Sequence, residues 1–212
     1  MIYEFCAENF TKVPQAIDAG ARRIELCDHL EVGGTTPSEA IIQETLSYAH
    51  QHQTTVMVMI RPRQGNFVYT SDELDEMIQS IRLCQKLGAD GVVFGCLTQD
   101  NQIDVDAMHH LITEAAGMDI VFHMAFDSIP RASQEKAIQW LAQNGVRRIL
   151  THGGPSEQPI MNNLDWLKEL LIIAEEFNIE ILPGGGINTE NGPAIAKELG
   201  VSQLHGTKVV PL

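Results

Sequence analysis

Two stretches of the chain place a glutamate and a cysteine two positions apart, Glu4 with Cys6 in YEFC and Glu25 with Cys27 in IELC. Each pair lies in a short apolar run typical of a strand, where side chains two positions apart point to the same face. Two carboxyl groups and two thiols are therefore predicted to share one surface. The carboxyl groups would offer proton transfer or charge pairing, and the thiols would offer ligands for a soft metal ion.

Further reactive side chains follow later apolar runs. Arg61 and Arg63 stand in IRPR, and their guanidinium groups would clamp a carboxylate or a phosphate. His123 stands in FHMAFD, where we interpret it as an acid or electrophile beside a glutamate base. His152 is a secondary candidate. The residues predicted to be catalytic are Glu4, Glu25, Arg61, His123 and Asp127.

Glycines near the end of the chain suggest a place for an anion. Gly185 and Gly186 lie in PGGGIN, and Gly206 lies in HGT. In position and glycine content these resemble the phosphate site that the last two loops of a barrel form. With Arg63, they are the predicted anion-binding residues. The alternative is that the glycines make tight turns and that Asn188 caps a helix.

The elements that position these residues alternate regularly. Eight β-rich runs, separated by helical patterns, occur at residues 2–6, 22–27, 54–60, 91–96, 119–126, 147–152, 179–185 and 202–206. This alternation favours a TIM-like (β/α)8 barrel, with an open doubly wound sheet as the rival. In such a barrel the reactive residues lie at the carboxyl ends of the strands, where the candidates above fall. The other interpretation is an internal ion-pair network that neutralises the glutamates with Arg61 and Arg63.

Helix signals accompany the strands. Thr36 with Glu39, and Thr70 with Glu73, have the spacing of capping boxes, the first with Pro37 at the first helical position.

The eighth helix of the barrel is missing, because only residues 207–212 follow the last strand. We expect a gap there, with Val209 and Val210 near solvent, and hence a homodimer that buries this flank. The alternative is that the short tail folds back and covers the gap itself.

Composition limits the possible functions. With 212 residues, of which 44% are apolar, the chain is predicted to form one domain over residues 1–212. Its net charge of −14 argues against nucleic acid or an anionic membrane as partner. No apolar run has the length of a membrane span, and no signal peptide precedes the first strand, so we expect a cytoplasmic protein whose four cysteines are thiols.

Several segments together resemble one known family. EFCAEN, RIELC followed by EVGGTTPS, MIRPRQGNF, FHMAFD, RILTHGG and PGGGIN are similar, in this order, to the CutC family associated with copper homeostasis. The resemblance covers residues 2–205, and IRPR followed by G-x-F is its most distinctive part. It implies a TIM-like barrel, a cytoplasmic location and a role with Cu(I).

Copper agrees with the chemistry of the two thiols. Cu(I) prefers thiolate and thioether ligands, and Cys6 and Cys27 end strands that should be neighbours. Met57, Met59 and Met124 would add soft donors, or would simply pack in the core. Cys84 is predicted to pack on a helix face, and Cys96 is a remoter candidate. The alternative function is an enzyme that acts on a small carboxylated or phosphorylated metabolite through Glu4 or Glu25, Arg61 with Arg63, and His123.

Overall fold

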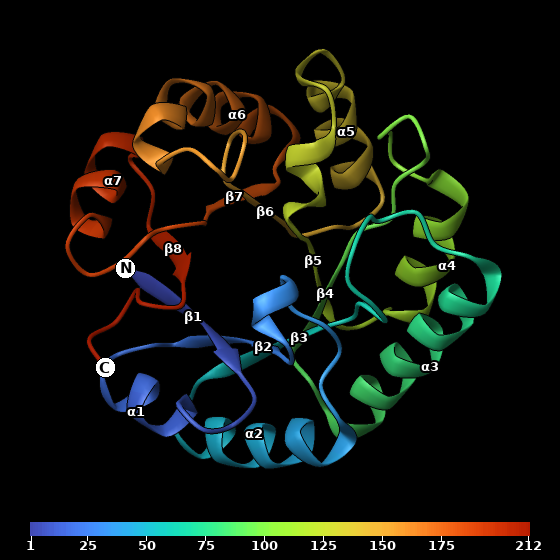
Figure 1. Cartoon of the computed structure of the whole chain (residues 1–212), viewed down its shortest axis with the longest axis vertical. Helices are drawn as coiled ribbons and strands as arrows, with labels where there is room; N and C mark the ends of the chain where they lie inside the picture. The colour runs from blue at the N-terminus through green and yellow to red at the C-terminus, as the bar shows by residue number, and fades with distance from the viewer.

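The computed structural model describes residues 1–212. Eight parallel strands curve into a nearly closed barrel inside a ring of helices, which Figure 1 views from one end. The strands are β1 (Ile2–Glu8), β2 (Arg23–Cys27), β3 (Thr55–Met59), β4 (Gly91–Phe94), β5 (Asp119–Phe122), β6 (Arg148–Thr151), β7 (Glu180–Pro183) and β8 (Gln203–Gly206). The predicted TIM-like barrel is confirmed, and the open doubly wound sheet is excluded, because β8 returns to pair with β1.

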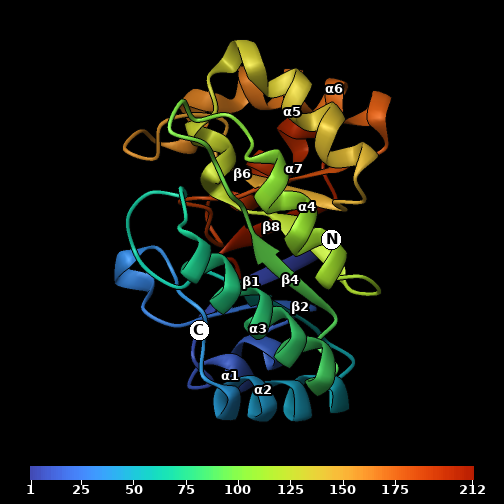
Figure 2. The same ribbon diagram turned by 90° about the vertical axis from the view of Figure 1, so that its right-hand side faces the viewer.

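Seven α-helices connect the strands on the outside of the barrel. They are α1 (Val13–Asp18), α2 (Glu39–Gln51), α3 (Ser71–Leu87), α4 (Val105–Glu114), α5 (Arg131–Gln143), α6 (Leu164–Phe177) and α7 (Gly192–Leu199). Three short 3-10 helices lie in the loops after β2, β5 and β6, namely η1 (Leu30–Val32), η2 (Met124–Ser128) and η3 (Ile160–Asn163). The loops after β2 and β3 project from the same end of the barrel, at the left in Figure 2.

The barrel has one seam without a backbone ladder. Neighbouring strands hydrogen-bond in the order β7-β6-β5-β4-β3-β2-β1-β8, so the ring is open between β7 and β8. Side chains bridge this β7–β8 seam instead. The Gln203 amide donates to Glu180 at 3.1 Å and accepts from Arg148 Nε at 3.2 Å.

Alternation along the strands divides the buried side chains into two cores. An outer cluster of 50 buried residues fills the space between strands and helices. An inner cluster of 8 lies within the barrel and consists of Cys6, Cys27, Met57, Met59, Val93, Val121, Leu150 and Leu182. Because side chains alternate between the two faces of a strand, both cysteines of the Glu-x-Cys stretches point inward, as predicted.

One of the two predicted capping boxes is present. Thr70 and Glu73 cap α3 reciprocally, as expected. The prediction at Thr36 is wrong, because α2 begins at Glu39 after Ser38 and Pro37 precedes it. The Thr36 hydroxyl instead accepts a hydrogen bond from the backbone N–H of Arg61 at 2.8 Å. Thr36 therefore fixes the chain after β3 rather than the start of a helix.

The tail after β8 contains no helix, as predicted, but it does not leave the gap open. Val209 and Val210 are each only 3% exposed and belong to the outer core, while Lys208 forms a parallel bridge with Asn188. The expectation that both valines lie near solvent is wrong, and the alternative, a tail that covers the gap, is correct. A homodimer stays a prediction, but the tail gives it no support.

None of the helices combines the length and the apolar character that a membrane-spanning helix needs.

Candidate functional site

Two thiols and a carboxyl group meet inside the barrel at the carboxyl ends of its first two strands. Cys6 on β1 lies opposite Glu25 on β2 in the strand register, and Cys27 follows Glu25 on the same face. Both thiols donate to one oxygen, Glu25 Oε2, from Cys6 Sγ at 3.2 Å and from Cys27 Sγ at 3.7 Å. The two sulfurs and a Glu25 oxygen lie within 4.8 Å of one another, so this thiol site has the spacing of metal ligands.

A buried ion-pair network lies directly beneath the thiol site. Glu4 accepts hydrogen bonds from Arg23 Nε and, at 2.8 Å, from His205 Nδ1. The other ring nitrogen of His205 is 3.6 Å from Glu25 Oε2. Burial alone would raise the pKa of Glu4, but His205 and Arg23 outweigh it and lower that pKa to about 2. Glu4 is therefore a carboxylate in the folded protein.

The pKa values of the other groups of the site favour a cationic imidazole and protonated thiols. Burial would lower the pKa of His205, but Glu25, Cys6 and Glu4 raise it well above its ordinary value. Burial raises the pKa of Glu25. The contact with Cys27 and burial raise the pKa of the Cys6 thiol. The hydrogen bond with Cys6 lowers the pKa of the Cys27 thiol, but burial and Glu25 outweigh it and raise that pKa to about 11. A ligand that needs thiolates must displace these protons.

The thiol site forms the floor of a cavity of about 520 Å³ that opens at the carboxyl ends of the strands. Its walls come from η1, from the loops after β3 and β6, and from η2. Besides Cys6, Glu25, Cys27 and His205, the lining residues include Leu30, Val32, Met59, Arg61, Phe67, His123, Met124, Asp127, Leu150 and Glu157. Two of the three methionines considered as soft donors, Met59 and Met124, thus face the cavity, while Met57 packs in the inner core.

Arg61 and His123 both line the cavity, as candidates for binding or catalysis. The guanidinium of Arg61 lies over the ring of Phe67, 5.1 Å from its centroid, and the His123 ring lies 4.8 Å from the same ring. Burial and then Arg61 lower the pKa of His123 to about 3, so its imidazole is neutral at physiological pH.

Asp127 lines the cavity but uses both oxygens to fasten a loop. Oδ1 accepts from the Thr151 hydroxyl at 2.5 Å and from the Gly153 N–H at 3.1 Å, while Oδ2 accepts from the His152 N–H at 2.9 Å. The ring nitrogens of His152 face the carbonyl oxygens of Gly184 and Gln158. Both residues therefore position the loop after β6, and a catalytic role for Asp127 stays a prediction.

All four predicted anion-binding residues lie outside the cavity, namely Arg63, Gly185, Gly186 and Gly206. Arg63 points away and pairs with Glu73 of α3, so it does not form a clamp with Arg61. The three glycines are explained by the local structure, which leaves no room for a side chain or needs a positive φ. A side chain at Gly185 would stand 2.5 Å from the His152 ring, and one at Gly206 would stand 2.5 Å from the Ile187 carbonyl. Gly186 turns the chain at a positive φ of 75°.

Cys84 and Cys96 are buried in the outer core, away from the thiol site. For Cys84 this confirms the predicted packing role. For Cys96 it shows that the residue two positions past β4 faces the helices and not the barrel interior.

The alternative interpretation of the sequence, an ion-pair network in which Arg61 and Arg63 neutralise Glu4 and Glu25, named the wrong cations. Glu4 pairs with Arg23 and His205 instead. The sequence could have identified Arg23 as a partner of the glutamates, because Arg23 stands two positions before Glu25 in the same strand and so shares its face. His205 lies in β8, and no motif of the sequence marks it as a partner of Glu4.

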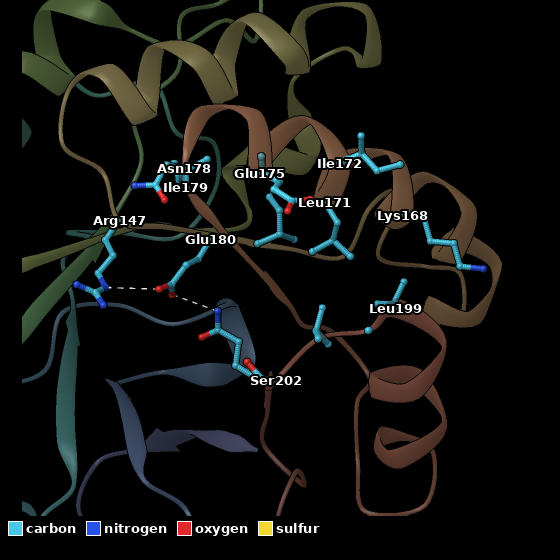
Figure 3. Close-up of a pocket in the computed structure, with 15 residues that line it drawn as sticks. Arg147, Lys168, Leu171, Ile172, Glu175, Asn178, Ile179, Glu180, Leu199 and Ser202 are labelled. Carbon is cyan, nitrogen blue, oxygen red and sulfur yellow. Dashed lines mark hydrogen bonds and ion pairs between the residues drawn. The ribbon is translucent and has the colours of Figure 1, made fainter.

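A larger hollow, of about 920 Å³, lies between α6, α7 and the starts of β7 and β8 (Figure 3). It contains none of the predicted site residues. Its charged groups pair with their neighbours, Arg147 with Glu180 and Lys168 with Glu198. This hollow lies along the β7–β8 seam, and we interpret it as a consequence of the missing ladder.

The fold and the site together define a class of protein, a (β/α)8 barrel with a buried pair of thiols at the floor of its mouth. Within that class, the chain belongs to the CutC family, whose sequence profile matches residues 1–210.

Relatives and solved structures agree with this assignment. A CutC family protein of Enterococcus faecalis is 56% identical over 210 residues, which cover 99% of this chain and 100% of the relative. The crystal structure of CutC from Streptococcus agalactiae, a protein provisionally assigned to copper homeostasis, superposes with a TM-score of 0.96 at 45% identity and covers 99% of this chain and 100% of that one. Deoxyribose phosphate aldolase from Aeropyrum pernix superposes with a TM-score of 0.66 at 12% identity, and the match covers 97% of this chain and 84% of the aldolase chain. At this identity the likeness shows the fold alone.

Proposed function

We propose that this chain binds Cu(I) through Cys6 and Cys27 and acts in copper homeostasis. The observation that carries the proposal is the convergence of two thiols from neighbouring strands on one carboxyl oxygen, with the three ligand atoms within 4.8 Å. Cu(I) is soft and binds thiolates with low coordination numbers, and thioether sulfurs of Met59 and Met124 line the same cavity. The name of the similar Streptococcus agalactiae protein agrees with this ligand.

The charges around the thiols suit a monovalent ion. Two thiolates with one Cu(I) would carry a net charge of −1. Arg23 and cationic His205 both pair with Glu4, so these three groups together carry one net positive charge. That positive charge would offset the charge of the copper site, since an unpaired buried charge is costly. A structural zinc ion almost always takes four protein ligands, and the thiol site offers three, Cys6, Glu25 and Cys27.

A competition titration under reducing, anaerobic conditions tests the proposal. Cys6→Ser and Cys27→Ser should each weaken Cu(I) binding more than about 100-fold, beyond the 10- to 100-fold that outer-shell partners typically cost. Cys84→Ala is the matched control, because its thiol is buried elsewhere and should leave the affinity unchanged. Equal Cu(I) affinity in wild type and Cys27→Ser would exclude this site.

The cytoplasm is the proposed location. All four cysteines are free thiols in the structure, including the neighbouring Cys6 and Cys27, and free thiols are typical of a reducing compartment. Cell fractionation with an antibody against the native chain tests this, and recovery outside the cytosol would contradict it.

The second candidate function, an enzyme for a small anionic metabolite, has support from one part of the site. Arg61, His123 and Glu25 line the cavity together. Glu4 is held by Arg23 and His205 and is not free to act as a base, and Arg63 lies elsewhere.

A further inference from the structure

Two N–H donors on the cavity wall are buried and have no partner. Arg61 is 5% exposed and His123 is 4% exposed, and neither Arg61 Nε nor His123 Nε2 forms a hydrogen bond. Both residues line the cavity. A buried donor without an acceptor is destabilising, so two such donors on residues that line a cavity point to an acceptor that arrives from outside.

The guanidinium of Arg61 is held rigidly and carries an unpaired charge. Its terminal nitrogens donate to the carbonyl oxygens of Val32 at 3.1 Å, Gly34 at 3.0 Å and Gly65 at 2.9 Å. Five of the other seven arginines form ion pairs with carboxylates, but Arg61 forms none. A charge that is nearly fully buried needs a counter-charge, and no side chain supplies one here.

The tautomer of His123 follows from its backbone contact. Nδ1 accepts a hydrogen bond from the Ala125 N–H at 3.2 Å, so in the neutral ring the proton is on Nε2. His123, which lines the cavity, therefore carries its unused donor on Nε2. Because Phe67 contacts both the Arg61 guanidinium and the His123 ring, the two unused donors belong to the same wall.

We propose that this wall binds a small organic carboxylate, whose oxygens accept hydrogen bonds from Arg61 Nε and His123 Nε2. Two N–H donors with one positive charge match one carboxylate in charge and in hydrogen bonds. The cavity, at about 520 Å³, falls within the range of small-molecule sites. The carboxylate site uses Arg61 and His123, not the proposed copper ligands Cys6 and Cys27, in the lining of the same cavity.

Charge favours a carboxylate over a phosphate. Arg61 is the only arginine in the cavity lining, no lysine lines it, and Glu25, Asp127 and Glu157 add acidic groups. Cationic His205 on the floor is already paired with Glu4. A phosphate dianion would therefore meet one free cation among several acids. The glycines that would cradle a phosphate lie outside the cavity.

Binding of defined probes to the metal-free, reduced protein tests the proposal. Acetate, pyruvate, succinate and benzoate, with inorganic phosphate as the competing class, would be titrated by calorimetry and by ligand-observed NMR. We expect at least one carboxylate to bind and phosphate to bind more weakly. Arg61→Lys and His123→Phe should each weaken that carboxylate about tenfold or more, since a hydrogen bond to a charged group is lost.

Two controls separate the outcomes. Arg82→Gln removes an exposed arginine on α3, outside the cavity lining, and should leave binding unchanged. His123→Phe keeps an aromatic ring against Phe67, so its loss of binding would not reflect lost packing. The proposal would be overturned if all four carboxylates failed to bind or if phosphate bound more tightly. It would also be overturned if His123→Phe or Arg61→Lys bound the carboxylate as tightly as wild type. None of these results depends on whether Cu(I) binds.

Discussion

Glu4 and His205 stand 201 positions apart and form a hydrogen bond of 2.8 Å inside the barrel. This contact joins the first strand to the last, where β1 and β8 pair. It also connects the ion-pair network to the thiol site, because the second ring nitrogen of His205 is 3.6 Å from Glu25. The stability of the barrel and the electrostatics of the site therefore depend on the same carboxylate.

Glu4→Gln should destabilise the protein by about 3–5 kcal/mol, because Arg23 and His205 would be left as buried charges without their partner. Urea unfolding of the metal-free protein measures the change. Glu8→Gln, at the exposed end of the same strand, is the control and should change stability little. Equal effects of the two substitutions would contradict a special role for Glu4.

Acid should remove the contribution of Glu4 over a defined range. Its folded pKa of about 2 lies below the ordinary value of 4.5, so its contribution is complete above pH 4.5 and is lost as the pH falls toward 2. The loss should be roughly 3 kcal/mol, since one unit corresponds to about 1.4 kcal/mol. Unfolding free energies measured across this range should fall less steeply for Glu4→Gln than for wild type, and parallel curves would contradict the assignment.

His205 should have the opposite pH dependence. Its folded pKa is raised, so its contribution is complete below the ordinary value of 6.5 and declines as the pH rises through the folded pKa. His205→Gln should therefore flatten the alkaline side of the stability curve. An NMR titration of the imidazole gives a direct check, and a resonance that titrates at or below the ordinary value would contradict the ion pair with Glu4.

Cys6 should be the first of the four cysteines to react with a thiol reagent. It is 7% exposed and lines the cavity, whereas Cys27, Cys84 and Cys96 have no exposed surface. Peptide mapping after a short iodoacetamide pulse in native buffer should find label mainly on Cys6. If Cu(I) binds as proposed, prior addition of Cu(I) should suppress that label and leave the slow labelling of Cys84 unchanged. Faster labelling of Cys84 would contradict the cavity as the route of access.

Substitutions at the buried valines of the tail should reduce the stability of the protein and leave its oligomeric state unchanged. Val209→Ala with Val210→Ala should cost roughly 2 to 4 kcal/mol in total, at about 0.8 kcal/mol for each buried methyl or methylene group removed. Leu212→Ala, at an exposed end, is the control. Light scattering of wild type and the double variant should give the same mass. A dimer that dissociates in the double variant at unchanged stability would restore the tail as an interface.

Much of the fold was readable from the sequence because it depends on periodic patterns. The alternation of strands with helices gave the barrel, and the period of two placed Cys6 and Cys27 on its inner face. The capping box at Thr70 was recognisable because α3 follows it at once, whereas the similar spacing at Thr36 lies in a loop.

The site was less predictable because its side chains come from loops and from distant parts of the chain. Arg61 and Arg63 look equivalent in sequence, yet loop carbonyls hold one in the cavity and Glu73 draws the other away. No spacing rule relates His205 to Glu4, which meet only when the barrel closes. The burial of Val209 and Val210 likewise depends on how the tail folds back.

The β7–β8 seam means that hydrogen-bond order and chain order differ at one place only, since β8 bonds to β1 and not to β7. A circular permutant that starts at Gly200, just after α7, would bring the two orders into agreement, with the strands arranged from β8 through β1 to β7. The linker from Leu212 to Met1 would have to run back along the outside of the barrel, which is the path of the absent eighth helix. No backbone ladder joins β7 to β8, so the new chain ends would lie between two strands whose hydrogen bonds to each other come from side chains. The barrel should therefore still assemble.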